Sequence, residues 1–209
     1  MNMTQDAYWT LDGETGAEMR VKGSRFIGYA SSVDSPEEAD EHLRVIRKKY
    51  HGATHHCFAY RIGTDGEIFR RSDDGEPSGT AGKPILEALA GRNLTDALCI
   101  VTRYFGGVKL GTGGLARAYG ACAAQTLDAA KVVLKHIHVS FRMIFPYDAT
   151  GTVMSLLSGA GSRIIETHYG EDTEILIRVP RALAEDLSFR LREATGGKVT
   201  LYPVTGGGH

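Results

Sequence analysis

The sequence predicts an α+β protein of two domains, residues 1–136 and 137–205, followed by a tail at 206–209. Three observations support this prediction. A chain of 209 residues is long enough for one or two domains with a real core. Apolar residues make up 42% of the chain and charged residues 23%, both close to the averages of globular proteins. The hydrophobic pattern also changes at Ile137, where a new series of alternating, strand-like segments begins.

The first predicted domain opens with two strands, 17–21 and 24–33, joined by a turn at Lys22-Gly23. A helix then begins at Ser35, because Ser35 can cap it, proline follows at the first helical position and Glu38 can reach back. Its apolar face extends to about residue 50. Two further strands, predicted at 55–62 and 67–71, are separated by a turn and form a hairpin.

A polar, glycine-rich loop follows at 72–84 and leads into a helix from about Ile85 to Ala90. Asp73, Asp74 and Glu76 place three carboxylates within four residues of this loop. Three interpretations remain open: turn and cap residues, a Mg²⁺ site, or general acid and base groups of an enzyme. The first is the commonest role of Asp in a turn before a helix, and we expect it here.

A second glycine-rich loop lies between a buried strand, predicted at 97–101, and a helix at 115–130. Glycine is costly to order, so such a loop indicates an unusual backbone conformation or a close approach by another group. From Arg103 to Arg117 there are three positive charges and no acid, and a helix begins there. Free N–H groups at a helix N-terminus favour phosphate or carboxylate. The sequence therefore predicts an anion-binding or nucleic-acid-binding surface. Its candidate residues are Lys83, Arg103, Tyr104, Lys109, Gly111, Thr112, Gly113, Gly114 and Arg117.

The second predicted domain alternates strands and helices in the order β-α-β-β-α-β. Its first strand carries alternating apolar residues from Val139 to Phe145, and Asp148 is placed to cap the helix that follows. The order of elements is that of the ferredoxin-like arrangement. No catalytic constellation is evident in this half, and we expect a docking surface or scaffold.

Charge and cysteine content restrict the classes of function. The formal net charge is −1 at pH 7. Neither half is a polycation, so any contact with nucleic acid has to come from a local patch. The basic run 47–49 is interpreted as a match to the dipole of its helix C-terminus. Cys57, Cys99 and Cys122 lie among apolar residues and indicate core positions in a reducing compartment. The sequence shows no signal peptide and no apolar run long enough to cross a bilayer, so we expect a cytoplasmic protein without a membrane partner.

We expect no cofactor and no metal. The segment 79–84 lacks the upstream glycine and the Ser or Thr of a phosphate-binding P-loop. The segment 111–116 lies too far beyond its strand for a dinucleotide fold. His51, His55 and His56 have no second cluster of ligands with metal spacing.

Two blocks, SDDGEPSGTAGKPILEAL at 72–89 and RYFGGVKLGTGGLARAYG at 103–120, resemble the shared core of the IMPACT family, in its bacterial, YigZ-like branch. The resemblance implies a first domain with the ribosomal-protein-S-five domain-two-like fold, which also occurs as domain IV of elongation factor G. It implies a second, ferredoxin-like domain resembling domain V of that factor. It also implies a role near translation, to which no reaction is firmly attached.

Two hypotheses of different classes follow. In the first, the protein is a translation-associated module without catalysis that binds RNA or the ribosome through the glycine-rich, locally basic surface. In the second, it is a hydrolase or transferase acting on a phosphorylated small molecule, with Asp73, Asp74 or Glu76 as base or Mg²⁺ ligand. Small-molecule kinases similar to this fold also place a glycine loop before a helix, but the serine pair typical of them is absent here.

Overall fold

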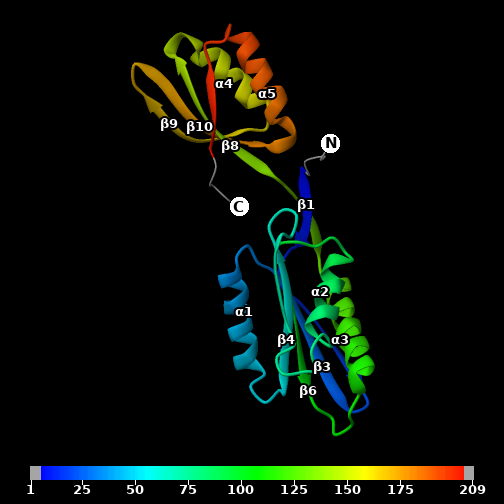
Figure 1. The fold of residues 1–209 in the computed structure, drawn as a ribbon. Helices are drawn as coiled ribbons and strands as arrows, with labels where there is room; N and C mark the ends of the chain where they lie inside the picture. Colours follow the sequence, from blue (N-terminus) through cyan, green and yellow to red (C-terminus); the bar gives the residue numbers. More distant parts are fainter. Residues whose placement is uncertain (1–5, 205–209) are drawn as a thin grey trace. The chain divides into compact units, whose positions relative to one another are not determined.

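The computed structural model describes residues 6–204. Among these the chain divides into two compact units, which we call the first domain (7–135) and the second domain (136–204, with Asp6) (Figure 1). The two-domain α+β class expected from the sequence is confirmed. The tail expected at 206–209 lies outside the described residues.

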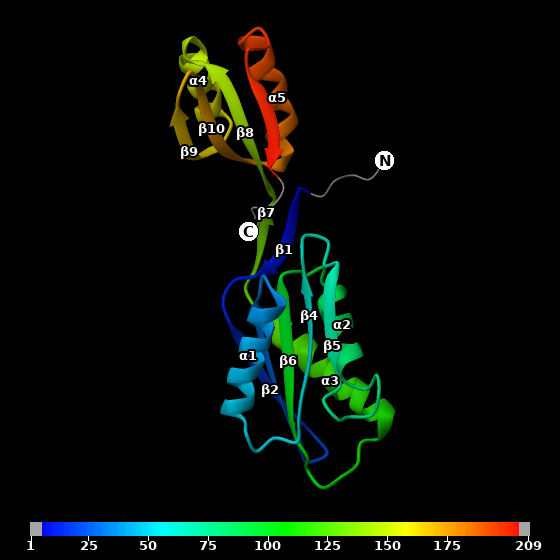
Figure 2. The same cartoon turned by 60° about the vertical axis from the view of Figure 1, so that its left-hand side comes forward.

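The first domain is a five-stranded antiparallel sheet with helices on both faces. The strand order β2-β3-β6-β4-β5 puts β6 at the centre. Helix α1 packs on one face, and α2 and α3 pack on the other (Figures 1 and 2). Strands β1 and β7 pair separately. The elements are β1 Ala7–Leu11, β2 Thr15–Val21, β3 Ser24–Ser32, α1 Pro36–Lys49, β4 His55–Ile62, β5 Ile68–Ser72, α2 Gly82–Ala90, β6 Ala97–Tyr104, α3 Gly111–Asp128 and β7 Val132–His136.

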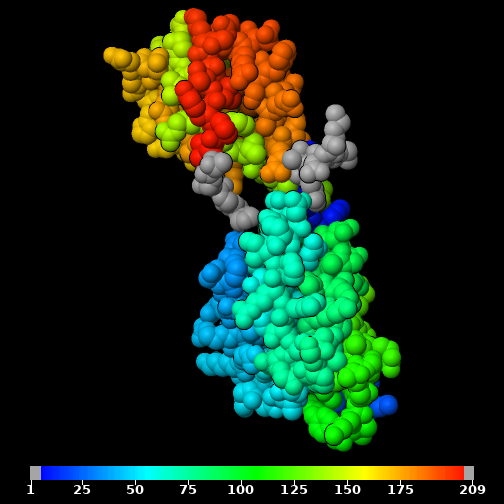
Figure 3. Space-filling view, in the orientation of Figure 1, coloured from blue at the N-terminus to red at the C-terminus, as the bar shows by residue number. Residues whose placement is uncertain are grey.

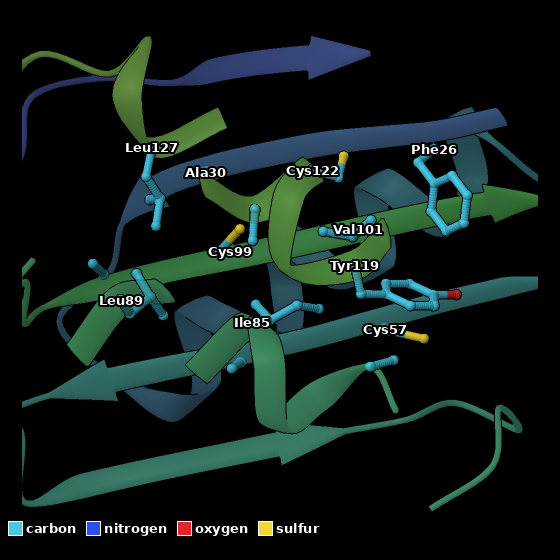
Figure 4. Packing of buried hydrophobic residues seen from close by; sticks show 14 of the residues in the cluster. Phe26, Ala30, Cys57, Ile85, Leu89, Cys99, Val101, Tyr119, Cys122 and Leu127 are labelled. Carbon is cyan, nitrogen blue, oxygen red and sulfur yellow. The ribbon is translucent and has the colours of Figure 1, made fainter. Parts of the chain in front are cut away.

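The core explains the continuous apolar run 97–101 in β6. This strand is covered by α1 on one side and by α2 and α3 on the other, so both sets of alternating side chains are buried. In the layer beneath α3, the ring of Tyr119 meets Phe26 edge-to-face at 5.2 Å between centroids (Figure 4). All three cysteines are buried and free, as predicted for core residues.

Close approach of α3 to the sheet requires a glycine on β3. A Cβ atom added to Gly28 would lie 1.8 Å from the Thr126 hydroxyl oxygen, far inside van der Waals contact. Gly28 thus belongs to the architecture of the domain. Helix α1 begins as predicted, with the Ser35 hydroxyl accepting a hydrogen bond from the Glu38 N–H.

Three predicted boundaries around the glycine-rich loops were wrong. The central strand continues past Val101 to Tyr104. Helix α3 begins at Gly111 instead of Leu115, and α2 begins at Gly82 instead of Ile85. The predicted end of β6 was too early because Arg103 is polar in type although it is buried. The two predicted helix starts were too late because both helices begin with glycine, which the first turn of a helix tolerates, since its N–H groups have no intrahelical partner.

The second domain has the predicted order of elements. Its four antiparallel strands lie in the order β11-β8-β10-β9, the ferredoxin-like arrangement, and α4 and α5 cover one face. The predicted cap by Asp148 was wrong, because a 3₁₀ turn (147–149) precedes α4 and Asp148 instead pairs with Lys198 at 2.7 Å. The elements are β8 His138–Pro146, α4 Thr150–Gly159, β9 Arg163–Tyr169, β10 Asp172–Pro180, α5 Arg181–Ala194 and β11 Thr200–Val204. Among the described residues, no helix is long and apolar enough to cross a bilayer.

Candidate nucleic-acid interface

The N-terminus of α3 is open. Leu110 occupies the cap position and offers no side-chain hydrogen bond, and the first turn contains no acid. Gly111 has a φ of 71°, which favours glycine, and no atom lies within 4 Å of where its Cβ would be. The predicted residues Thr112, Gly113 and Gly114 therefore form a first helical turn whose N–H groups and positive dipole end lack a side-chain cap.

The segment leading into α3 is exposed along most of its length. Residues 105–109 and 111–113 are exposed, and so is Arg117 one turn later. Lys109 and Arg117 have no ion pair or hydrogen-bonding partner within residues 6–204. Figure 3 shows this green segment at one end of the first domain. Two of the three cations predicted between residues 103 and 117 are thus available to an external anion.

The third cation, Arg103, is buried, and its predicted place on the surface needs correction. Because β6 continues to Tyr104, Arg103 is a strand residue that points toward α3, with only 5% of its area exposed. Its guanidinium donates hydrogen bonds to Glu76 Oε1 at 2.6 Å and to the Ser24 hydroxyl at 3.2 Å. Its guanidinium carbon also lies 5.6 Å from the ring centre of Phe26 and 5.5 Å from that of Phe105. Arg103 therefore neutralises an internal carboxylate.

Glu76 connects three elements through this ion pair. Its Oε1 atom also accepts a hydrogen bond of 2.8 Å from the Tyr119 hydroxyl on α3. Burial raises the pKa of Tyr119, which stays protonated and remains a donor. The loop 72–81 is thereby attached to both the centre of the sheet and the helix. Glu76 is therefore a structural anchor, with both bonds at Oε1 made inside the domain and a side chain that is buried.

Asp73 holds the start of α2. Its carboxylate accepts hydrogen bonds of 2.8–2.9 Å from the backbone N–H groups of Gly79, Ala81 and Gly82. Partial burial is the largest single influence and raises the pKa of the Asp73 carboxyl, but the three hydrogen bonds and the charge of Arg71 together outweigh it, so its pKa lies below the ordinary value. Ala81, at the cap position, cannot do this itself. The turn-and-cap interpretation therefore describes Asp73.

Asp74 faces a different direction from its neighbours. It accepts hydrogen bonds of 2.6 Å from Arg47 of α1 and from the backbone N–H of His56. The three predicted carboxylates are therefore bound to different partners. Within residues 6–204, no group of three His, Cys, Asp or Glu side chains is placed to hold a metal ion.

Tyr104 and Lys83 have partners of their own outside α3. Consecutive strand residues point to opposite faces, so Tyr104 points away from α3, toward Arg25, whose guanidinium lies 5.8 Å from its ring. Lys83 is in the first turn of α2, where its Nζ lies 3.8 Å from Glu87. Lys109, Arg117 and the glycine turn thus stay together at the start of α3, whereas Arg103 and Tyr104 contact other groups and Lys83 pairs within α2.

Lys22 joins the same surface and was missed by the sequence analysis. The β2–β3 turn packs against the segment after β6 so closely that a Cβ on Gly106 would lie 1.9 Å from the carbonyl carbon of Gly23. The Ser24 hydroxyl also accepts a hydrogen bond from the Gly106 N–H. Lys22 adopts a φ of 45°, which is uncommon for a residue other than glycine or asparagine. The one feature of the sequence that could have indicated Lys22 is its place in the predicted Lys-Gly hairpin turn.

A groove of about 300 Å³ adjoins these cations, between β2 and α3. Its lining residues are Met19, Val21, Lys22, Leu110, Gly114, Arg117, Ala118 and Ala121. We call Lys22, Lys109, Arg117 and the turn 111–114 the α3 surface.

The chain matches two family models in succession. Residues 22–127 match the Impact N-terminal domain, and residues 143–198 match a domain of unknown function, DUF1949. The chain is 38% identical to the IMPACT family member YvyE of Bacillus subtilis, over 92% of this chain and 88% of that protein. It is 32% identical to the IMPACT family member YigZ of Escherichia coli, over 88% of this chain and 91% of that protein.

One solved structure, titled "Crystal structure of an hypothetical protein", superposes with a TM-score of 0.75 at 29% identity. The alignment covers 97% of this chain and 99% of that one. Eukaryotic relatives match over a shorter part: the Protein IMPACT homolog of Dictyostelium discoideum is 36% identical over 46% of this chain and 29% of its own length. The fold, both domain matches and full-length bacterial relatives lead to one conclusion: the chain belongs to the IMPACT family.

Proposed function

We propose that this protein is a translation-associated regulatory protein that binds RNA, free or within the ribosome, through the α3 surface. The observation that carries the proposal is the arrangement at the start of α3. Lys22, Lys109 and Arg117, without partners among the described residues, surround a helix N-terminus that has neither a side-chain cap nor an acid in its first turn.

Such an arrangement favours phosphate for two independent physical reasons. Unpaired N–H groups and the helix dipole attract an anion at the helix end. The three surrounding cations add a charge contact that releases counterions from the nucleic acid. Because the whole chain has a net charge of −1, the attraction has to be local, and we expect moderate affinity with a shallow salt dependence.

Membership of the IMPACT family supports the link to translation. The resemblance noted in the sequence implies that the first domain is similar to domain IV of elongation factor G. The second domain has the ferredoxin-like strand order that the same resemblance implies for domain V of that factor. This support rests on similarity of fold, so the partner itself is part of the proposal. The three carboxylates considered for an enzyme each accept internal hydrogen bonds and do not favour the alternative.

Co-sedimentation of the full-length chain with ribosomes over a salt series, together with binding to short RNA oligonucleotides, tests the proposal. We expect the protein to bind at low salt and to bind more weakly as the salt concentration rises. The double variant Lys109→Glu/Arg117→Glu should lose this binding. Lys48→Glu is a matched control, because Lys48 is an exposed lysine on α1, across the sheet from α3. Absence of binding at low salt would reject the proposal. Loss of binding in the Lys48→Glu variant alone would indicate that the interface lies on α1 instead.

A further inference from the structure

The groove beside the α3 surface combines an apolar floor with a basic rim. Met19 and Val21 of β2 face Ala118 and Ala121 of α3 across it. No carboxylate is among its lining residues, and its only charged members are Lys22 and Arg117. The charge of the groove therefore complements an anion attached to an apolar group.

The groove exists because of side-chain size. Strand β2 is an edge of the sheet, and the apolar side chains on its α3-facing side are only partly buried. Opposite them, α3 presents the small residues Gly114, Ala118 and Ala121, which do not fill the space. A volume of about 300 Å³ is at the lower end of the range of about 300–1,000 Å³ for ligand pockets. It suits one small planar group better than an extended ligand.

Lys22 is held at the rim by a strained backbone. Its φ of 45° is a conformation that asparagine or glycine would adopt at lower cost. The turn that carries it is fixed by contact with Gly106. A lysine kept at such a position is consistent with a role for its charge beside the groove.

We propose that this groove receives one unpaired base of an RNA strand whose phosphates lie on the α3 surface, so that the ligand is single-stranded RNA. The inference rests on the function proposed above. An unstacked base offers a flat apolar face for the floor, and the Arg117 guanidinium can stack on it, as arginine does in many RNA sites. Met19 adds a thioether, which makes favourable contacts with aromatic rings. Bases in a duplex remain stacked on each other and cannot enter.

The test uses the full-length chain and three labelled ligands in fluorescence anisotropy at one salt concentration: a short oligoadenylate, the same strand with abasic residues, and its duplex with oligouridylate. We expect the abasic strand to bind at least about 5-fold more weakly than oligoadenylate. An Ala121→Leu substitution fills the groove without changing charge. It should weaken oligoadenylate binding by a similar factor and leave binding of the abasic strand unchanged.

Gln125→Leu is the matched control, because residue 125 is exposed on the same helix and outside the groove. Both variants should unfold at the temperature of the native protein. Equal affinity for the oligoadenylate and abasic strands, tighter binding of the duplex, or no effect of Ala121→Leu would overturn the base-binding groove while leaving phosphate binding intact. Failure of all three ligands to bind at low salt would instead reject the proposed function, and the groove proposal with it.

Discussion

The Arg103 guanidinium donates a hydrogen bond of 2.6 Å to the Glu76 carboxylate in the interior of the first domain. The two side chains are only 6% and 4% exposed. Because Tyr119 donates to the same oxygen atom, one carboxylate joins the central strand, the loop before α2 and helix α3. Removal of one member of a buried ion pair leaves the other charge unpaired in the interior, which is strongly unfavourable.

We expect Glu76→Ala to lower the free energy of unfolding by about 3–5 kcal/mol, measured by urea denaturation. Glu87→Ala is the control, because Glu87 forms an exposed pair with Lys83 at 3.8 Å and should contribute less than about 1 kcal/mol. An equal loss of unfolding free energy in the two variants would show that the buried ion pair contributes no more to stability than the exposed one.

Arg103→Met should likewise destabilise the first domain but leave the salt dependence of RNA binding unchanged. The reason is that Arg103 contacts an internal carboxylate and does not reach an external phosphate. The measurement is the slope of the logarithm of the binding constant against the logarithm of salt concentration, at a temperature where the variant is folded. A smaller slope in the variant would indicate that Arg103 does contact the RNA phosphates.

Asp73 should make stability depend on pH. Its pKa is lowered in the folded protein, so its contribution is fully present above the unfolded pKa of about 3.9 and is lost as the pH falls through the folded pKa. Asp73→Asn removes the charge and one acceptor oxygen, and it should cost about 1–3 kcal/mol at neutral pH. The difference between the native protein and the variant should shrink below roughly pH 4, as measured by denaturation across pH. Asp65→Asn, at an exposed turn residue, should show no such difference.

Periodicity was sufficient for much of the fold. The order of elements in the second domain followed from alternation and helical spacing, most clearly in β10, where buried residues alternate with less buried ones. The strand β6 was predicted from a continuous apolar run instead of from alternation, because helices cover both of its faces. Its end was misplaced because Arg103 is polar in type but buried in fact, and a sequence does not show which carboxylate neutralises an arginine.

The candidate site was only partly predictable for a related reason. Lys109 and Arg117 are close in sequence and share one helix start, so local pattern found them. Lys22 reaches the same surface through the contact of Gly23 with Gly106, which are far apart in the chain. The groove depends on the absence of large side chains opposite Met19, and such absences become visible only when the elements are packed.

Lys109→Ala should weaken RNA binding regardless of base sequence and reduce the log–log salt slope by about one. The side chain is exposed and unpaired within the described part of the chain, so its removal should not change stability measurably. Lys48→Ala provides the comparison on the other side of the sheet. A sequence-dependent effect would indicate a base contact, and an unchanged slope would remove Lys109 from the α3 surface.

Packing of α3 on β3 can be tested at Gly28. An alanine there would place its Cβ 1.8 Å from the Thr126 hydroxyl oxygen, so either the side chain or the helix has to move. We expect Gly28→Ala to lower the free energy of unfolding of the first domain by about 1–3 kcal/mol, the usual cost of overpacking. Thr126→Ala removes the crowding atom together with its hydrogen bond to the Cys122 carbonyl. The loss of unfolding free energy in the double variant should therefore be smaller than the sum of the losses in the two single variants. Gly52→Ala is the control and should have little effect, because the nearest atom to its Cβ would lie at an ordinary 3.8 Å. Additive losses in the double variant would mean that the helix does not depend on this glycine for its close approach.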